Sequence, residues 1–176
     1  MDPDVARRVA ILGCGGSGKS WLSARVGERL GLPVYGLDAF YFGAGWTPAP
    51  HKEFERLQRE LVARSSWVID GNHASTAEIR IAAADVVVFL DRSSASCLWG
   101  LVRRRIGRKG PPRAGVPGAE RLNPRFVFHV ATFRLRRRAQ MLKLLRTKVA
   151  GHLIVLQNGR QMRAFLSSLP HGAKRS

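Results

Sequence analysis

Residues 13–20 read GCGGSGKS and directly follow the apolar run VAIL, residues 9–12. Two phosphate-binding patterns coincide in this stretch. Its glycines spell G-x-G-x-x-G, the fingerprint of dinucleotide sites, and the whole stretch spells G-x-x-x-x-G-K-S, the loop that holds nucleoside triphosphates. Both patterns need a strand, a tight turn and a helix in succession. The sequence offers this context, because apolar residues recur one turn apart over residues 19–30.

The two residues after the last glycine favour the triphosphate loop. In such a loop Lys19 would reach the β- and γ-phosphates, and the hydroxyl of Ser20 would hold Mg²⁺, whereas a dinucleotide site needs neither group. An acidic residue about 20 positions after the fingerprint is typical of dinucleotide sites. Asp38 supplies one, so Asp38 does not separate the two interpretations. We therefore expect ATP and Mg²⁺ as cofactors and keep a nicotinamide-dependent oxidoreductase as a minor alternative.

The backbone of such a loop makes an anion site. Its N–H groups point inward around the phosphates, and the N-terminus of the following helix adds the positive end of its dipole. Cys14 lies within the loop, where a side chain can be exposed, and we interpret it as a tolerated small residue. The residues predicted to bind the cofactor phosphates are Gly13, Cys14, Gly15, Gly16, Ser17, Gly18, Lys19 and Ser20.

Length and composition limit the class of protein. The chain has 176 residues, of which 45% are hydrophobic, and this suits one α/β domain with its own core over residues 1–170. No apolar run reaches the ~18 residues that span a bilayer, and the N-terminal stretch MDPDVARR has no apolar signal core. Two cysteines suggest neither a disulfide framework nor a metal set. We expect a cytoplasmic enzyme.

The charge of the chain is strongly asymmetric. The formal net charge is +18; residues 1–91 hold 10 Lys and Arg against 11 acids, whereas residues 92–176 hold 20 Lys and Arg against one acid. Such asymmetry implies an anionic partner for the C-terminal half. Nucleotides, nucleic acid and acidic lipid head groups all qualify, and a solvated arginine-rich surface is the simpler alternative.

The pattern of apolar runs predicts alternating strands and helices. Each predicted strand is almost wholly apolar, which indicates a parallel sheet covered by helices on both faces. Residues 39–50 and 107–123 are rich in Gly and Pro and are predicted as loops, and residues 171–176 as a flexible tail. The predicted strands are 9–12, 34–38, 67–70, 86–90 and 153–156; the predicted helices are 19–30, 51–64, 76–84, 93–106, 124–148 and 160–169.

Three aspartates end predicted strands, namely Asp38, Asp70 and Asp91. Ligands of open α/β sheets bind outside the carboxyl ends of the strands, so all three are expected near the loop. Phosphoryl transfer needs a carboxylate near Mg²⁺ and often another that orients the acceptor. We assign Asp70 to the metal, together with Ser20, and Asp38 to the acceptor. Asp91 is interpreted as a supporting or helix-capping acid.

Arginines gather at the end of the helix 93–106 and in the following loop. Arginines stabilise the negative charge that spreads during phosphoryl transfer, and a loop that closes over the phosphates excludes water. We therefore predict a lid over residues 107–123. The lid arginines are Arg103, Arg104, Arg108 and Arg113, with Arg104 counted among the catalytic residues beside Lys19, Asp38 and Asp70.

These segments together resemble a known family. The stretches GCGGSGKSWLSARVGERLGLPVYGLDAFYF…GW, WVIDGNH, ADVVVFLDR…RRR and PGAERLNPRFVF, in this order, are similar to the topology-modulation-protein group of adenylate-kinase-like proteins. The resemblance covers residues 7–168. It implies a three-layer P-loop kinase fold with a five-stranded parallel sheet in the order 2-3-1-4-5, an acceptor-binding segment over 38–65 and a lid. It also implies that Arg80 binds an acceptor phosphate.

The sequence also departs from that family. Gly100 stands where monophosphate kinases often carry an arginine, Arg104 fills the second such position, and the lid reads PPRAG. The favoured hypothesis is a kinase that moves the γ-phosphoryl group of ATP to a small acceptor such as a nucleoside monophosphate. The alternative is an ATP-regulated protein whose basic C-terminal half binds nucleic acid.

Overall fold

A computed structural model gives the structure of the chain and describes residues 6–43, 47–106 and 124–170. Its strands are β1 (Arg8–Gly13), β2 (Val34–Gly36), β3 (Trp67–Asp70), β4 (Val86–Leu90) and β5 (His152–Leu156). Its helices are α1 (Lys19–Leu30), α2 (Leu37–Tyr41), α3 (His51–Val62), α4 (Ala77–Ala83), α5 (Ser94–Ile106), α6 (Pro124–Arg136), α7 (Arg138–Lys148) and α8 (Gly159–Ser168), with a short 3₁₀ turn η2 (Ala74–Thr76) before α4. None of the helices in these ranges is both long and apolar enough to cross a membrane.

The strands form one parallel sheet in the order β2-β3-β1-β4-β5, as expected. The central strand β1 pairs with β3, where Ile11 lies opposite Asp70, and with β4, where Leu12 lies opposite Phe89. Dinucleotide-binding folds place the second strand beside the first, in the order 3-2-1-4-5-6. The observed order therefore contradicts the dinucleotide interpretation of the glycine loop.

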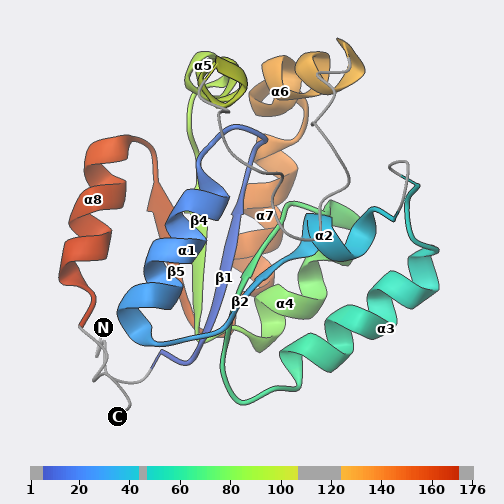
Figure 1. Cartoon of the computed structure of the whole chain (residues 1–176), viewed down its shortest axis with the longest axis vertical. Coiled ribbons are helices and arrows are strands. Elements are labelled where there is room, and N and C mark those ends of the chain that lie inside the picture. The colour runs from blue at the N-terminus through green and yellow to red at the C-terminus, as the bar shows by residue number, and fades with distance from the viewer. Residues whose placement is uncertain (1–5, 44–46, 107–123, 171–176) are drawn as a thin grey trace.

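Helices cover both faces of the sheet (Figure 1), and alternate residues of the strands belong to two separate cores. In β1, Ala10 and Leu12 belong to the core under α3, α4 and α7, whereas Val9 and Ile11 belong to the core under α1 and α8. Every residue of β3 and β4 is buried. The near-continuous apolar character of these strands follows, because a sheet covered on both faces leaves no side for polar residues.

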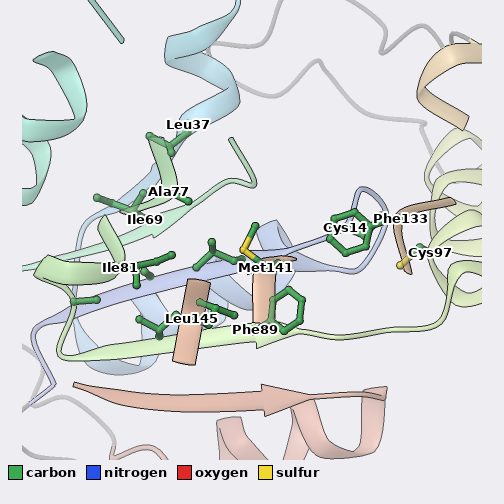
Figure 2. Close-up of a cluster of buried hydrophobic side chains, with 14 of the residues drawn as sticks. Cys14, Leu37, Ile69, Ala77, Ile81, Phe89, Cys97, Phe133, Met141 and Leu145 are labelled. Atoms are coloured by element: carbon green, nitrogen blue, oxygen red, sulfur yellow. The ribbon is translucent and has the colours of Figure 1, made fainter. Parts of the chain in front are cut away.

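The predicted helix 124–148 is two helices, because its halves pack against different parts of the molecule. The helix α6 ends at Arg136, and the backbone leaves helical geometry at Arg137 before α7 begins. Figure 2 shows Met141 and Leu145 of α7 in the core on the sheet, while Phe133 of α6 lies at the end of that core nearest the glycine loop.

The segment after β2 contains a helix that the sequence did not predict. The strand ends at Gly36, and Asp38 lies in the first turn of α2 instead of at a strand end. An antiparallel bridge between Phe42 and Pro48 then closes the described part of the turn. This short helix turns the chain toward α3 and presents Asp38 at the carboxyl edge of the sheet.

Candidate active site

The glycine loop joins β1 to α1 through backbone conformations that L side chains rarely adopt. Gly16 has a φ of 75° and Gly18 a φ of 97°, both left-handed. A Cβ atom at Gly16 would also lie 2.1 Å from the carbonyl oxygen of Cys97 in α5. Glycine is therefore required at position 16 for both its backbone geometry and its contact.

The start of α1 is built to receive an anion. Gly18 caps the helix without a side chain, and the first turn holds no acid, so no side chain of that turn competes for its N–H groups. The hydroxyl of Ser17 is buried with no hydrogen-bond partner in the protein. Lys19 Nζ donates to the carbonyl of Cys14 at 3.0 Å and so folds over the same loop. These unsatisfied donors and the ammonium group fit phosphate oxygens.

The carboxylate expected on the metal side is buried behind the loop. Asp70 accepts a hydrogen bond from Ser23 Oγ at 2.7 Å, and that hydroxyl lies 3.2 Å from the carbonyl oxygen of Ser20. Among the described residues no three His, Cys, Asp or Glu side chains gather around a common point. A magnesium ion needs no such cluster, since it is usually held by one or two protein oxygens together with substrate phosphates and water. Ser20 and Asp70 fit that donor set.

Asp38 lies across the carboxyl edge from these groups and is paired with a histidine. Its Oδ1 is 3.1 Å from His73 Nε2; the Asp38 side chain is 60% exposed and that of His73 only 15%. Burial alone would raise the pKa of Asp38. The hydrogen bond from His73 and the charges of Lys19 and Arg104 outweigh it, so that the pKa lies below its usual range. Asp38 is thus ionised and interacts electrostatically with both Lys19 of the loop and Arg104 of α5.

Aromatic rings fix the position of His73. Its ring centroid lies 4.5 Å from that of Tyr41 in α2 and 4.8 Å from that of Phe54 in α3. The imidazole is therefore held between the two elements that flank the acceptor side. This packing allows His73 to orient the exposed carboxylate of Asp38.

Arg80 is wholly buried in the structure. Its guanidinium donates to Gln58 Oε1 at 2.9 Å and to the carbonyls of Gly71 at 3.1 Å and His73 at 3.4 Å. Burial lowers the pKa of Arg80 to about 10, although Asp70 and Asp38 act in the opposite direction, so the group stays cationic at neutral pH. Arg80 therefore braces the turn that carries His73, a positioning role that the sequence did not indicate. Contact with an acceptor phosphate stays a prediction.

The helix α5 rests directly on the glycine loop. A Cβ atom at Gly100 would lie 2.1 Å from the carbonyl oxygen of Gly16. This contact leaves no room for a side chain at position 100. Arg104, one turn further along, is half-buried and lowers the pKa of Asp38, whereas Arg103 is exposed. Arg108 and Arg113 lie outside the described residues, so the lid over 107–123 stays a prediction.

Cys14 and Asp91 have structural roles. Cys14 is buried, and its thiol is hydrogen-bonded with that of Cys97, which together with burial raises its pKa, so Cys14 is a neutral core group and not an exposed one. Asp91 does not cap a helix. Its carboxylate pairs with Arg138, at 2.7 Å from Oδ1 to Nε and 2.6 Å from Oδ2 to Nη2, and so ties the end of β4 to the start of α7.

Solved structures of small-molecule kinases share this architecture. A sugar kinase from a Janibacter species matches with a TM-score of 0.52 and 17% identity over 93% of this chain and 94% of that one. Shikimate kinase from Acinetobacter baumannii, solved with shikimate, matches at 0.55 and 15% over 93% and 90%. Shikimate kinase from Bacteroides thetaiotaomicron matches at 0.56 and 15% over 94% and 97%.

The chain has the P-loop kinase fold. At these identities the similarity shows the fold and not the substrate. No protein-family model matches the sequence, and no curated protein matches it.

Within this P-loop kinase fold, His73 is the site residue that sequence reasoning missed. It follows the strand-end motif WVIDGN by one position, and this place at the carboxyl edge of β3 was the available signal. The pairing with Asp38 depends on α2, which the sequence predicted as loop. Asp38 could be assigned to the site from the sequence, whereas its pairing with His73 could be recognised only from the structure.

Proposed function

We propose that the protein is an ATP- and Mg²⁺-dependent kinase that phosphorylates a small molecule. The observation that carries the proposal is the placement of an ionised, histidine-paired Asp38 within the field of Lys19 at one edge of the sheet. A phosphate loop alone indicates nucleotide binding. A loop faced by an oriented carboxylate also provides a place for the acceptor, as phosphoryl transfer requires.

Each group has a role in the proposed reaction. The loop amides and Lys19 bind the β- and γ-phosphates, and Arg104 stabilises negative charge on the transferred group. Mg²⁺, when bound near Ser20 and Asp70, supplies neutralisation of phosphate charge. For a hydroxyl acceptor, Asp38 accepts the proton of the attacking oxygen at one of its carboxylate oxygens, whereas for a phosphate acceptor, which is already ionised, it only orients the acceptor; His73 holds that carboxylate in place in both cases. The attacking oxygen forms its bond to the γ-phosphorus as the bond to ADP breaks.

Two acceptor classes have separate support. A nucleoside monophosphate is supported by the resemblance to adenylate-kinase-like proteins and by Arg104, whose positive charge is close enough to lower the pKa of Asp38. A hydroxyl-bearing molecule is supported by the exposed carboxylate of Asp38, and the neighbours in fold are named as kinases of sugars and of shikimate. The alternative of an ATP-regulated protein that binds nucleic acid through its basic C-terminal half has no support from the neighbours in fold, which are named as kinases of small molecules.

The test is a panel of acceptors incubated with γ-labelled ATP. Nucleoside monophosphates form one arm, and sugars and hydroxy acids form the other; we expect label in one arm. With a hydroxyl acceptor, Asp38→Asn should lose transfer by about a hundredfold or more, as is typical of a lost general base; with either acceptor it should transfer more slowly than the parent protein and keep its affinity for Mg·ATP. His51→Asn, which alters an exposed histidine on α3, is the control and should react like the parent protein. Transfer at the parental rate in Asp38→Asn would contradict the proposal.

A further inference from the structure

The helices α5 and α6 carry most of the exposed large apolar side chains of the described residues. The exposed fractions are 65% for Trp99, 42% for Val102, 75% for Ile106, 56% for Phe128 and 87% for Leu135. Their spacing, i, i+3 and i+7 on α5 and i and i+7 on α6, puts them on one face of each helix. We call these five side chains the α5–α6 face.

This face points away from the protein on both helices. The opposite faces hold Leu101 of α5 and Val130 of α6, which are buried in the core beside the glycine loop. The two helices contact one another and lie together at one end of the molecule, near the phosphate loop (Figure 1). The remaining exposed large apolar residues are scattered singly over other elements, namely Trp21, Val34, Phe40 and Val155. Single exposures are ordinary, whereas a gathered set marks an interaction surface.

The surroundings of the α5–α6 face are strongly cationic. Arg103, Arg105, Arg134 and Arg136 are exposed on the same two helices, and the guanidinium of Arg136 lies over the Phe128 ring, 5.2 Å from its centroid. The sequence has no Asp or Glu over residues 92–106 or 124–170. The occupant of this face must therefore carry negative charge and also accept aliphatic side chains.

Charge excludes two occupants from within the protein itself. A second copy of the face would bring arginines against arginines. The sequence 107–123 carries four Lys and Arg against one acid, so its net positive charge does not complement the arginines of the face. Its only large aliphatic residues are Val116 and Leu122. Duplex nucleic acid would pair with the arginines, yet it offers Ile106 and Leu135 no apolar surroundings.

We propose that the α5–α6 face docks on the surface of an anionic phospholipid bilayer. Helices that lie in a membrane interface combine Trp, Phe and Leu on one face with flanking Lys and Arg, as these two do. Ile106, Leu135 and Trp99 would enter the boundary between headgroups and acyl chains, and the arginines would pair with lipid phosphates. Attachment would be peripheral, since no helix of the described residues can span the bilayer.

Co-sedimentation with vesicles tests the proposal. The full chain is mixed with vesicles of phosphatidylcholine alone or of phosphatidylcholine with phosphatidylglycerol. We expect binding to the anionic vesicles only. The double variant Ile106→Ser/Leu135→Ser should weaken that binding about tenfold or more, because two aliphatic side chains no longer leave water. Arg103→Gln should weaken it about fivefold, in line with one cation near an anionic surface.

The controls separate this outcome from unfolding and from simple charge attraction. Val155→Ser removes an exposed apolar side chain from β5 and should bind vesicles like the parent protein. The double variant should keep the parental affinity for Mg·ATP, which shows that its fold is intact. Absence of binding to anionic vesicles at low salt would overturn the proposal, and so would undiminished binding by the double variant. Tighter binding to duplex DNA, lost in the double variant, would assign the face to nucleic acid instead.

Discussion

At the scale of single residues, the site depends on the ionisation and orientation of Asp38. The carboxylate is only partly exposed, and its pKa is lowered because the hydrogen bond from His73 and two nearby cations outweigh the effect of its partial burial. A lowered pKa keeps the group ionised as the pH falls to about 4. Asp38 is therefore available as a proton acceptor throughout the neutral range.

Replacing His73 tests this pairing. His73→Phe keeps an aromatic ring between Tyr41 and Phe54 and removes the hydrogen bond to Asp38. The pKa of Asp38 should then rise, so the acid limb of the kcat/KM profile should move to higher pH, and kcat/KM at pH 7 should fall about tenfold as orientation is lost. His73→Gln, which retains a donor, should recover part of both effects. A profile for His73→Phe that overlays that of the parent protein would show that His73 does not act on Asp38.

At the scale of elements, the decisive contact is that of α5 with the phosphate loop. The sequence differs at Gly100 from the pattern of the family it resembles, and the structure shows that the helix approaches Gly16 too closely for any side chain there. The break between α6 and α7 at Arg137 could not be predicted from the sequence, since the residues on both sides keep a helical pattern. It arises from tertiary contacts, with Arg138 held by Asp91 and the two helices buried in different places.

Gly100→Ala tests the contact between α5 and the loop. The added methyl group must push α5 away from Gly16, so we expect unfolding free energy to fall by about 2 kcal/mol, a usual value for overpacking, and Mg·ATP to bind about tenfold more weakly. Gly159→Ala, at the first turn of α8 with only the end of Arg163 nearby, is the matched control. Urea unfolding and ATP titration of both variants give the comparison. Equal behaviour of the two variants would mean that α5 does not rest on the loop.

At the scale of the whole molecule, the alternation of strands and helices was predictable and the lateral order of the strands was not. Each strand is recognisable from its own apolar run, but pairing joins residues such as Ile11 and Asp70 that are far apart in the chain. The order 2-3-1-4-5 was predicted only from the resemblance to a family. The charge asymmetry was likewise visible in the sequence, whereas its concentration around exposed apolar residues of α5 and α6 needed the structure.

Asp85 links the sheet together at the edge opposite the site. Burial alone would raise its pKa, but hydrogen bonds from the Arg8 side chain and from the N–H groups of Arg8 and Arg7 lower it. The folded state therefore favours the ionised form, and this stabilisation is complete above about pH 4 and lost as the pH falls through the lowered pKa.

Asp85→Asn should reduce the free energy of unfolding by about 1–2 kcal/mol at pH 7, which is the low end for hydrogen bonds to charged groups because the pair is partly exposed, and by less at pH 3. Urea unfolding at both pH values measures this. The control is Glu28→Gln, which removes an exposed ion pair with Arg25 and should change stability by less than about 0.5 kcal/mol. A difference between Asp85→Asn and the parent protein that is the same at both pH values would contradict the linkage.

The central claim is that the loop at residues 13–20 holds a nucleoside triphosphate with its magnesium. Isothermal titration calorimetry of the folded protein with Mg·ATP measures this directly. We predict saturable binding below millimolar ligand, weakened at least about tenfold in Lys19→Ala, because one charge-assisted contact to phosphate is lost. Absence of heat with Mg·ATP and with Mg·GTP at millimolar concentration, on protein shown to be folded, would contradict the account.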